Sequence, residues 1–176
     1  VTGIRVELPH MERLARLTRF ELPPREKWTP ELAIQVSESA RPLRPGNEAW
    51  AYAMKVLRED PRDQGLPDAF VDLLHAIHAH KALSSQSESL LLDIMRRCRT
   101  GPNSIKGLLP KELEVAHKSG SGMGSTNDVG LVPLPNGTMA IAVLMRDSAK
   151  PSSEQSLAIA QVTKLIYENF SLKRAG

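Results

Sequence analysis

The sequence predicts an α+β fold in which an antiparallel sheet is flanked by helices. Apolar residues recur at helical spacing from about residue 67 to 99, and the period changes after Pro110, where three short strand-like runs follow. The last stretch returns to helical spacing. With 176 residues and 41% apolar content, the chain can also bury a packed core.

The first third of the chain predicts helices separated by a long loop. Residues 9 to 20 have apolar residues at helical spacing, whereas residues 21 to 47 contain five prolines, which break regular structure. We expect a loop there, with room for a short helix over Pro30 to Ser37. A further helix is predicted over Glu48 to Arg58.

Two longer helices follow. The first begins near Pro67, because proline is favoured in the first turn, and the second runs from Ser85 to Arg99 before the stop signal Thr100-Gly101-Pro102. Their expected apolar stripes are Phe70, Leu73, Leu74, Ile77 and Leu83, and then Leu90, Leu91, Ile94, Met95 and Cys98.

Beyond Pro110 the pattern predicts an antiparallel meander. Its strands are expected over Glu114 to Ser121, Asp128 to Pro133 and Met139 to Arg146, with Pro135-Asn136-Gly137 as the hairpin turn. A helix from Ser153 to Phe170 should pack on the sheet through Leu157, Ile159, Ala160, Val162, Leu165, Ile166 and Phe170. Three strands make a thin core, so we expect further strands from residues upstream.

Composition excludes several classes of protein. The 23 Lys and Arg residues stand against 20 Asp and Glu, the net charge of +3 is spread along the chain, and aromatic residues make up only 4%, which argues against nucleic acid as a partner. No apolar run approaches the ~18 residues of a membrane span. The first residues resemble the interior of a domain rather than a signal peptide, so we expect the natural chain to start earlier.

Cysteine and histidine offer no metal site. Cys98 is the single cysteine, so it excludes an intrachain disulfide, and we expect it to be a buried structural thiol. His75, His78 and His80 could suggest a metal site, but no carboxylate lies at ligand spacing among them. An exposed helix face is the better interpretation.

The most informative stretch is His117-Lys118-Ser119-Gly120-Ser121-Gly122, followed by Ser125-Thr126-Asn127-Asp128-Val129-Gly130. Alone, Lys-Ser-Gly could be a solvated hairpin with a flexible glycine loop. Its setting includes Thr100-Gly101 and Leu109-Pro110 upstream and Leu134-Pro135-Asn136-Gly137 downstream. In this order and spacing the segments resemble class A β-lactamases and penicillin-binding-type serine hydrolases. The resemblance covers about residues 60 to 170, including Asp60-Pro61-Arg62-Asp63 with Pro67.

The resemblance implies a fold and a chemistry. It implies a three-layer αβα domain, incomplete in this chain, with an omega-like region over residues 1–59, helices over 60–110, and the meander and last helix over 111–176. It also implies a serine hydrolase that acts on a β-lactam or peptidoglycan-like substrate, without cofactor or metal, and that is secreted or periplasmic.

Four residues would form the substrate-binding edge in such an enzyme. By the resemblance, Lys118 and Ser119 supply a cation and a hydroxyl, Gly120 keeps the strand edge open for the substrate, and the N–H of Ser121 stabilises the oxyanion.

Other family motifs are absent. The nucleophile's Ser-x-x-Lys and the Ser-Asp-Asn loop do not occur in these 176 residues, so we expect an upstream part of the same polypeptide to supply them. Thr2-Gly3-Ile4-Arg5-Val6 resembles the approach to the omega-type loop, but no Glu-x-x-Leu-Asn follows to activate the deacylating water. Glu7, His10 and Glu12 lie close to the expected place, and each fits a surface residue better than a base; as a substitute base Glu7 comes first and His10 second. A slowly deacylating penicillin-binding or esterase-like protein and a non-catalytic binding module remain alternatives.

Overall fold

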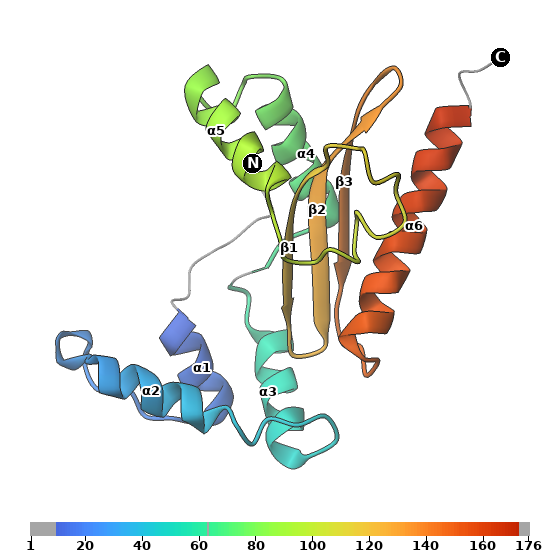
Figure 1. The fold of residues 1–176 in the computed structure, drawn as a ribbon. Helices are drawn as coiled ribbons and strands as arrows, with labels where there is room; N and C mark the ends of the chain where they lie inside the picture. Colours follow the sequence, from blue (N-terminus) through green and yellow to red (C-terminus); the bar gives the residue numbers. More distant parts are fainter. Residues whose placement is uncertain (1–9, 63, 173–176) are drawn as a thin grey trace. The chain divides into compact units, whose positions relative to one another are not determined.

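A computed structural model describes residues 10–62 and 64–172 (Figure 1). The described residues fall into two compact units, the first ending at Gln64 and the second beginning at Gly65.

The first unit is helical. It contains α1 (His10–Thr18), a short 3-10 helix (Arg25–Lys27), α2 (Pro30–Ser39) and α3 (Glu48–Glu59). The Thr29 hydroxyl and the Asn47 side chain accept hydrogen bonds from backbone N–H groups in the first turns of α2 and α3, which fixes where these helices begin. The expected loop over 21–47 therefore holds more helix than predicted, since α2 extends to Ser39.

The second unit has three layers. Helices α4 (Pro67–His78) and α5 (Ser85–Arg96) pack on one face of the sheet, and α6 (Ser152–Leu172) packs on the other (Figure 1). The predicted α+β fold and its helix–sheet–helix layers are confirmed.

The sheet is the predicted antiparallel meander. Its strands are β1 (Ala116–Gly122), β2 (Ser125–Leu134) and β3 (Gly137–Met145), in the order β1-β2-β3. Pro135 and Asn136 form the turn between β2 and β3, and Gly137 follows at φ 149°. The predicted hairpin is therefore confirmed. Strand β1 is an edge strand of the described sheet.

Side chains alternate between the two faces of the sheet, so each face has its own core. Ala116 and Leu131 pack with α4 and α5 in one cluster. Val115, Val132 and Ile141 pack with Ile159 of α6 in the other, together with Ile105 and Leu109 from the segment that joins α5 to β1. This segment therefore lies on the α6 face of the sheet.

Some predicted core residues are exposed. Leu83 lies beyond the end of α4, and Leu90 and Ile94 of α5 are 59% and 53% exposed. The buried side of α5 contains Met95, as predicted, but also Glu88 and Leu92, at helical steps of four and three residues. The helix also ends at Arg96, earlier than predicted.

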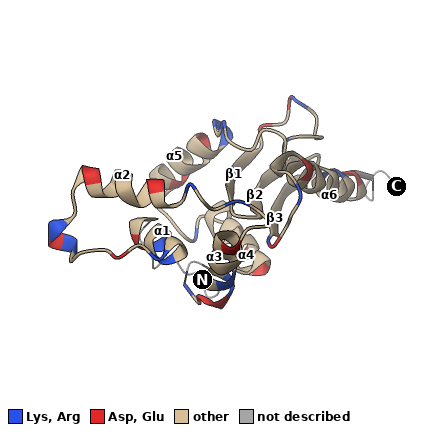
Figure 2. Cartoon of the chain, turned by 90° about the horizontal axis from the view of Figure 1, so that it is seen from below, with Lys and Arg blue, Asp and Glu red and all other residues tan. Residues whose placement is uncertain are grey.

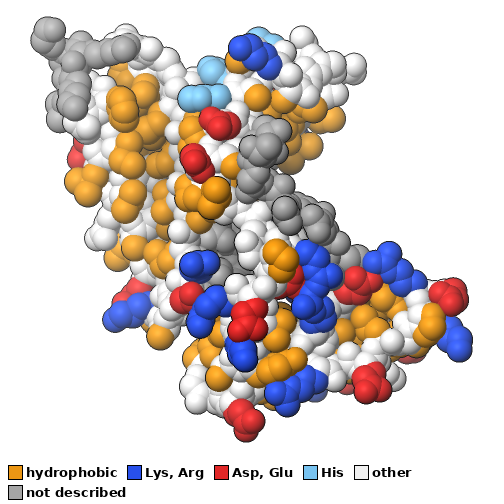
Figure 3. All heavy atoms as spheres, turned by 180° about the vertical axis from the view of Figure 1, so that it is seen from behind, with side chains coloured by type: hydrophobic (Ala, Val, Ile, Leu, Met, Phe, Trp, Pro, Cys, Tyr) orange, Lys and Arg blue, Asp and Glu red, His pale blue; other side chains and the backbone are white. Residues whose placement is uncertain are grey.

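Helix α6 shows the same division. Ile159 and Ala160 are buried, whereas Leu157, Val162, Leu165 and Phe170 are exposed. Hydrophobic side chains accordingly reach the surface on the face shown in Figure 3. Apolar residues occur around more of α6 than one layer of contacts can cover, which sequence periodicity alone does not reveal.

Candidate active site

The Lys-Ser-Gly motif lies on edge strand β1. Lys118, Gly120 and Ser121 are exposed, while Ser119 is only 9% exposed. An edge strand leaves part of its backbone N–H and C=O groups unpaired, so an extended ligand can pair alongside it. A Cβ added at Gly120 would meet no atom within 4 Å, so the face of β1 is open at this residue.

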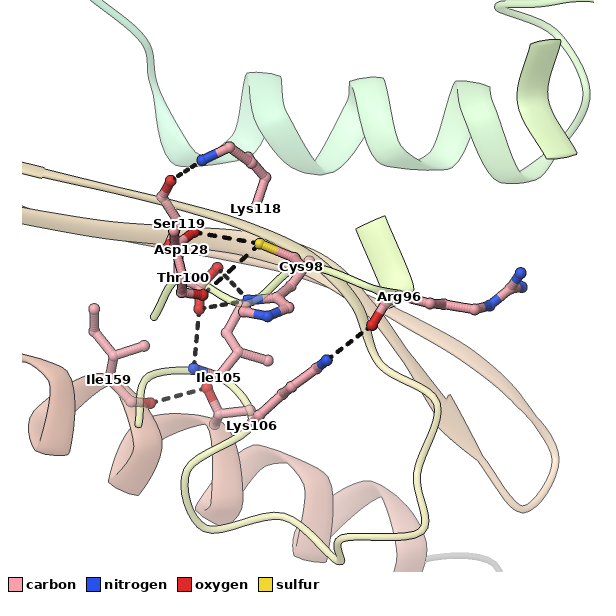
Figure 4. Close-up of polar contacts among 11 residues, drawn as sticks. Arg96, Cys98, Thr100, Ile105, Lys106, Lys118, Ser119, Asp128 and Ile159 are labelled. Atoms are coloured by element: carbon pink, nitrogen blue, oxygen red, sulfur yellow. Dashed lines mark hydrogen bonds and ion pairs between the residues drawn. The ribbon is translucent and has the colours of Figure 1, made fainter. Parts of the chain in front are cut away.

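Lys118 and Ser119 point to opposite faces of the strand, because side chains alternate along β-structure. The ammonium group of Lys118 donates to the backbone carbonyl of Ser119. Figure 4 shows it on the other side of β1 from Thr100. The structure thus keeps a cation at the exposed edge but directs the Ser119 hydroxyl inward.

The Ser119 hydroxyl is bound to the segment that precedes β1. It donates to Oγ1 of Thr100 over 2.8 Å. The close approach depends on Gly101, which has φ +63°, and a Cβ there would lie 2.6 Å from the Ser119 Cβ. Glycine at 101 therefore allows this segment to lie against β1.

A buried polar cluster lies next to this contact. Nδ1 of His117 lies 3.0 Å from both carboxylate oxygens of Asp128, and both side chains are fully buried. The carboxylate also accepts the backbone N–H of Ile105 at 3.1 Å (Figure 4). Gly130, paired with His117 across the sheet, allows β2 to lie close to β1 here, since a Cβ there would lie 2.6 Å from the Ala116 carbonyl oxygen and 2.9 Å from the His117 Cβ.

Cys98 lies nearer to this site than predicted. It follows the end of α5, is partly buried, and its Sγ lies 3.3 Å from Oγ1 of Thr100 (Figure 4). Burial opposes ionisation, but hydrogen bonds with Thr100 and with the backbone of Ser119, together with the charge of Lys118, lower the thiol's pKa below its usual value. The prediction of a buried thiol was therefore wrong, because Cys98 is only partly buried.

The candidate bases lie in or before the first unit. Glu7 lies outside the described residues. His10 is exposed at the start of α1, and Glu12 accepts a 2.8 Å hydrogen bond from Arg25, so its carboxylate is already partnered. The geometry gives neither His10 nor Glu12 a special role.

The first unit has a hollow of its own. A cavity of about 450 Å³ is lined in part by Arg16, Arg19, Tyr52 and Arg62. Arg16 and Arg62 bind Asp60, and the guanidinium of Arg19 stacks 3.9 Å from the centre of the Tyr52 ring. These contacts tie α1 to α3 and to the residues after it.

The histidines of the described part of the chain form no metal site. His75, His78 and His80 are exposed, and His80 Nδ1 lies 2.7 Å from a Glu88 carboxylate oxygen. Over the described residues there is no group of His, Cys, Asp or Glu that could hold a metal, and no helix is both long and apolar enough to span a membrane. Lys and Arg are scattered rather than gathered (Figure 2).

Comparison with known proteins assigns this chain to a family. The family model described as "Beta-lactamase enzyme family" matches residues 32–170. The chain belongs to the β-lactamase enzyme family. Its relatives, given below, are class A β-lactamases, so the family is that of class A β-lactamase-like serine hydrolases. The match begins at residue 32, earlier than residue 60, where the sequence resemblance began.

Two curated relatives come from Pseudomonas aeruginosa. Extended-spectrum β-lactamase PER-1 is 39% identical over 110 residues, covering 58% of this chain and 35% of its own length. β-Lactamase VEB-1 is 37% identical over 98 residues, covering 52% and 33%. The chain thus spans about a third of the length of these relatives.

Solved β-lactamase structures share the fold. TLA-1 extended-spectrum β-lactamase has a TM-score of 0.59 and 38% identity, over 62% of this chain and 42% of that one. TLA-3 extended-spectrum β-lactamase has a TM-score of 0.65 and 27% identity, over 97% and 50%. The similarity to TLA-3 therefore extends over nearly all of this chain.

Proposed function

We propose that this chain forms the substrate-binding edge of a serine β-lactamase-type hydrolase. Its substrate would be a β-lactam or a peptidoglycan-like amide, and its nucleophile would come from an upstream part of the same polypeptide. The observation that carries the proposal is the exposed Lys118-Ser119-Gly120 edge of β1 in a chain of this family.

The edge strand suits an anionic substrate. The Lys118 ammonium would attract the substrate's carboxylate, and the substrate's backbone would lie along the open edge at Gly120. The N–H of Ser121 would stabilise the negative charge that develops on the carbonyl oxygen. Ser119 would contact the carboxylate only when its hydroxyl leaves Thr100, so Lys118 should contribute more than Ser119.

The proposed reaction is acyl transfer. The upstream serine oxygen would bond to the amide carbon, the carbon–nitrogen bond of the β-lactam would break, and the serine's proton would end on the released nitrogen. Water would then cleave the resulting ester. By family membership, we place this reaction outside the cytoplasm, in a secreted or periplasmic protein.

Slow deacylation is the version that the sequence favours. Water attacks an ester fast when a positioned base removes its proton, an effect of typically ~100- to 10,000-fold. The Glu-x-x-Leu-Asn that supplies this base is absent from the chain. Glu7 is the carboxylate nearest to the expected place in the sequence, and it is the first substitute to test.

The experiment is stopped-flow kinetics of the whole protein, upstream segment included, with a chromogenic cephalosporin. We expect a burst of about one equivalent of product and then a slow steady rate. Fast turnover that survives removal of Glu7, His10 and Glu12 together would show that the base lies elsewhere. A folded protein that gives no burst and no turnover would instead support a binding module.

A further inference from the structure

The segment that joins α5 to β1 is held to the sheet at two points. Thr100 accepts the Ser119 hydroxyl of β1, and the Ile105 N–H donates to Asp128 of β2. Because Asp128 is paired with Ser119 across the sheet, both points lie beside the same part of β1. The position of the Lys-Ser-Gly edge thus depends on this segment as well as on β2.

His117, a residue of β1, also contacts Asp128, to which the Ile105 N–H is bound. Its Nδ1 lies 3.0 Å from each carboxylate oxygen of Asp128, so one carboxylate receives bonds from β1 and from the Ile105 backbone. His117 immediately precedes Lys118, so any shift of the imidazole moves the backbone that carries the ammonium. The pair therefore links three segments at the base of the candidate site.

Stability alone does not explain why polar groups occupy this place. Both side chains are fully buried, and Nε2 of His117 has no hydrogen-bond partner in the described part of the chain. A buried unpaired polar atom is costly, and well-packed apolar residues are often as stable as a buried charged pair. The presence of the pair fits a requirement for one defined strand position.

We propose that His117 and Asp128 are positioning residues that hold the Lys118-Ser119-Gly120 edge of β1 in the geometry needed for acylation. The inference rests on the proposed function. Neither side chain touches the substrate, since both are buried beneath the strand. They act through the backbone of β1 and through the segment from Thr100 to Ile105.

The test compares two substitutions of His117 in the whole protein. His117→Asn keeps a nitrogen donor near the place of Nδ1, whereas His117→Phe keeps a ring without a donor. We expect His117→Phe to slow acylation of a chromogenic cephalosporin at saturating substrate by ~10- to 100-fold, the cost of a misplacement of about 1 Å. His117→Asn should remain within about threefold of the wild type.

Thr163→Ala is the matched control. Thr163 is also fully buried, and its hydroxyl donates to the Ile159 carbonyl within α6. Its loss should lower the melting temperature without slowing acylation. If His117→Phe does not fold, Thr100→Val removes the other attachment at an exposed residue and should slow acylation in the same direction.

Hydrogen–deuterium exchange separates this inference from the proposed function. We expect faster exchange of the β1 and 100–105 amides in His117→Phe, but not in His117→Asn or Thr163→Ala, whether or not the protein acylates. Wild-type acylation and exchange in a folded His117→Phe would overturn the inference, as would equal slowing by His117→Asn. A wild-type protein that is not acylated would overturn the proposed function. In that case, β1 exchange in His117→Phe equal to that of the wild type would overturn the inference independently.

Discussion

Lys118→Ala should separate function from stability. The Lys118 side chain is exposed, and within the described residues its ammonium donates to the neighbouring Ser119 carbonyl. Removing it should change the free energy of unfolding by less than about 0.5 kcal/mol, as for most surface substitutions. A cation preorganised beside a scissile amide can instead contribute ~2 to 4 kcal/mol to the transition state, which corresponds to ~30- to 1,000-fold in rate.

The assay is the acylation rate of the whole protein with a chromogenic cephalosporin, measured beside urea denaturation. Lys111→Ala is the matched control, because Lys111 is an exposed lysine that precedes β1 in the same unit. We expect Lys111→Ala to match the wild type in both measurements. A folded Lys118→Ala that acylates at the wild-type rate would remove Lys118 from the site.

Two other predictions concern the neighbouring segment. Gly101→Ala should lower the free energy of unfolding by about 1 to 3 kcal/mol more than Gly46→Ala in urea denaturation, because both residues have positive φ but only Gly101 would clash; equal losses would contradict the contact with Ser119. The alkylation rate of Cys98 by iodoacetamide should rise at lower pH than that of a free thiol, because the lowered pKa gives more thiolate at a given pH. A pH profile of alkylation equal to that of a free thiol would contradict the lowered pKa of Cys98.

The fold was predictable wherever local signals agreed. Pro135-Asn136-Gly137 marked the hairpin, and the change of period after Pro110 marked the start of the sheet. Burial was less predictable, because periodicity identifies an apolar stripe but not which neighbour covers it. Leu90 and Ile94 were assigned to the core for that reason, while the structure buries Glu88.

The candidate site was predictable only in part. The motif located Lys118, Ser119, Gly120 and Ser121 on one strand. It did not show that the Lys118 ammonium and the Ser119 hydroxyl lie apart. Strand alternation places Lys118 and Ser119 on opposite faces, and only the contact with Thr100 shows where the hydroxyl is held.

The His117–Asp128 pair was missed. Its sequence signal was weak: two ionisable residues at inward-facing strand positions, with Gly130 opposite the imidazole. Only the paired register of β1 and β2 brings these two side chains together.

Intact-protein mass spectrometry of the whole protein mixed with a penicillin tests the acyl-enzyme account most directly. Opening the β-lactam ring loses no atoms, so we expect a mass increase equal to the entire penicillin, lasting for minutes and located on a serine upstream of these 176 residues. Unmodified protein beside hydrolysed penicillin would contradict slow deacylation. Unmodified protein beside intact penicillin would contradict acyl transfer itself.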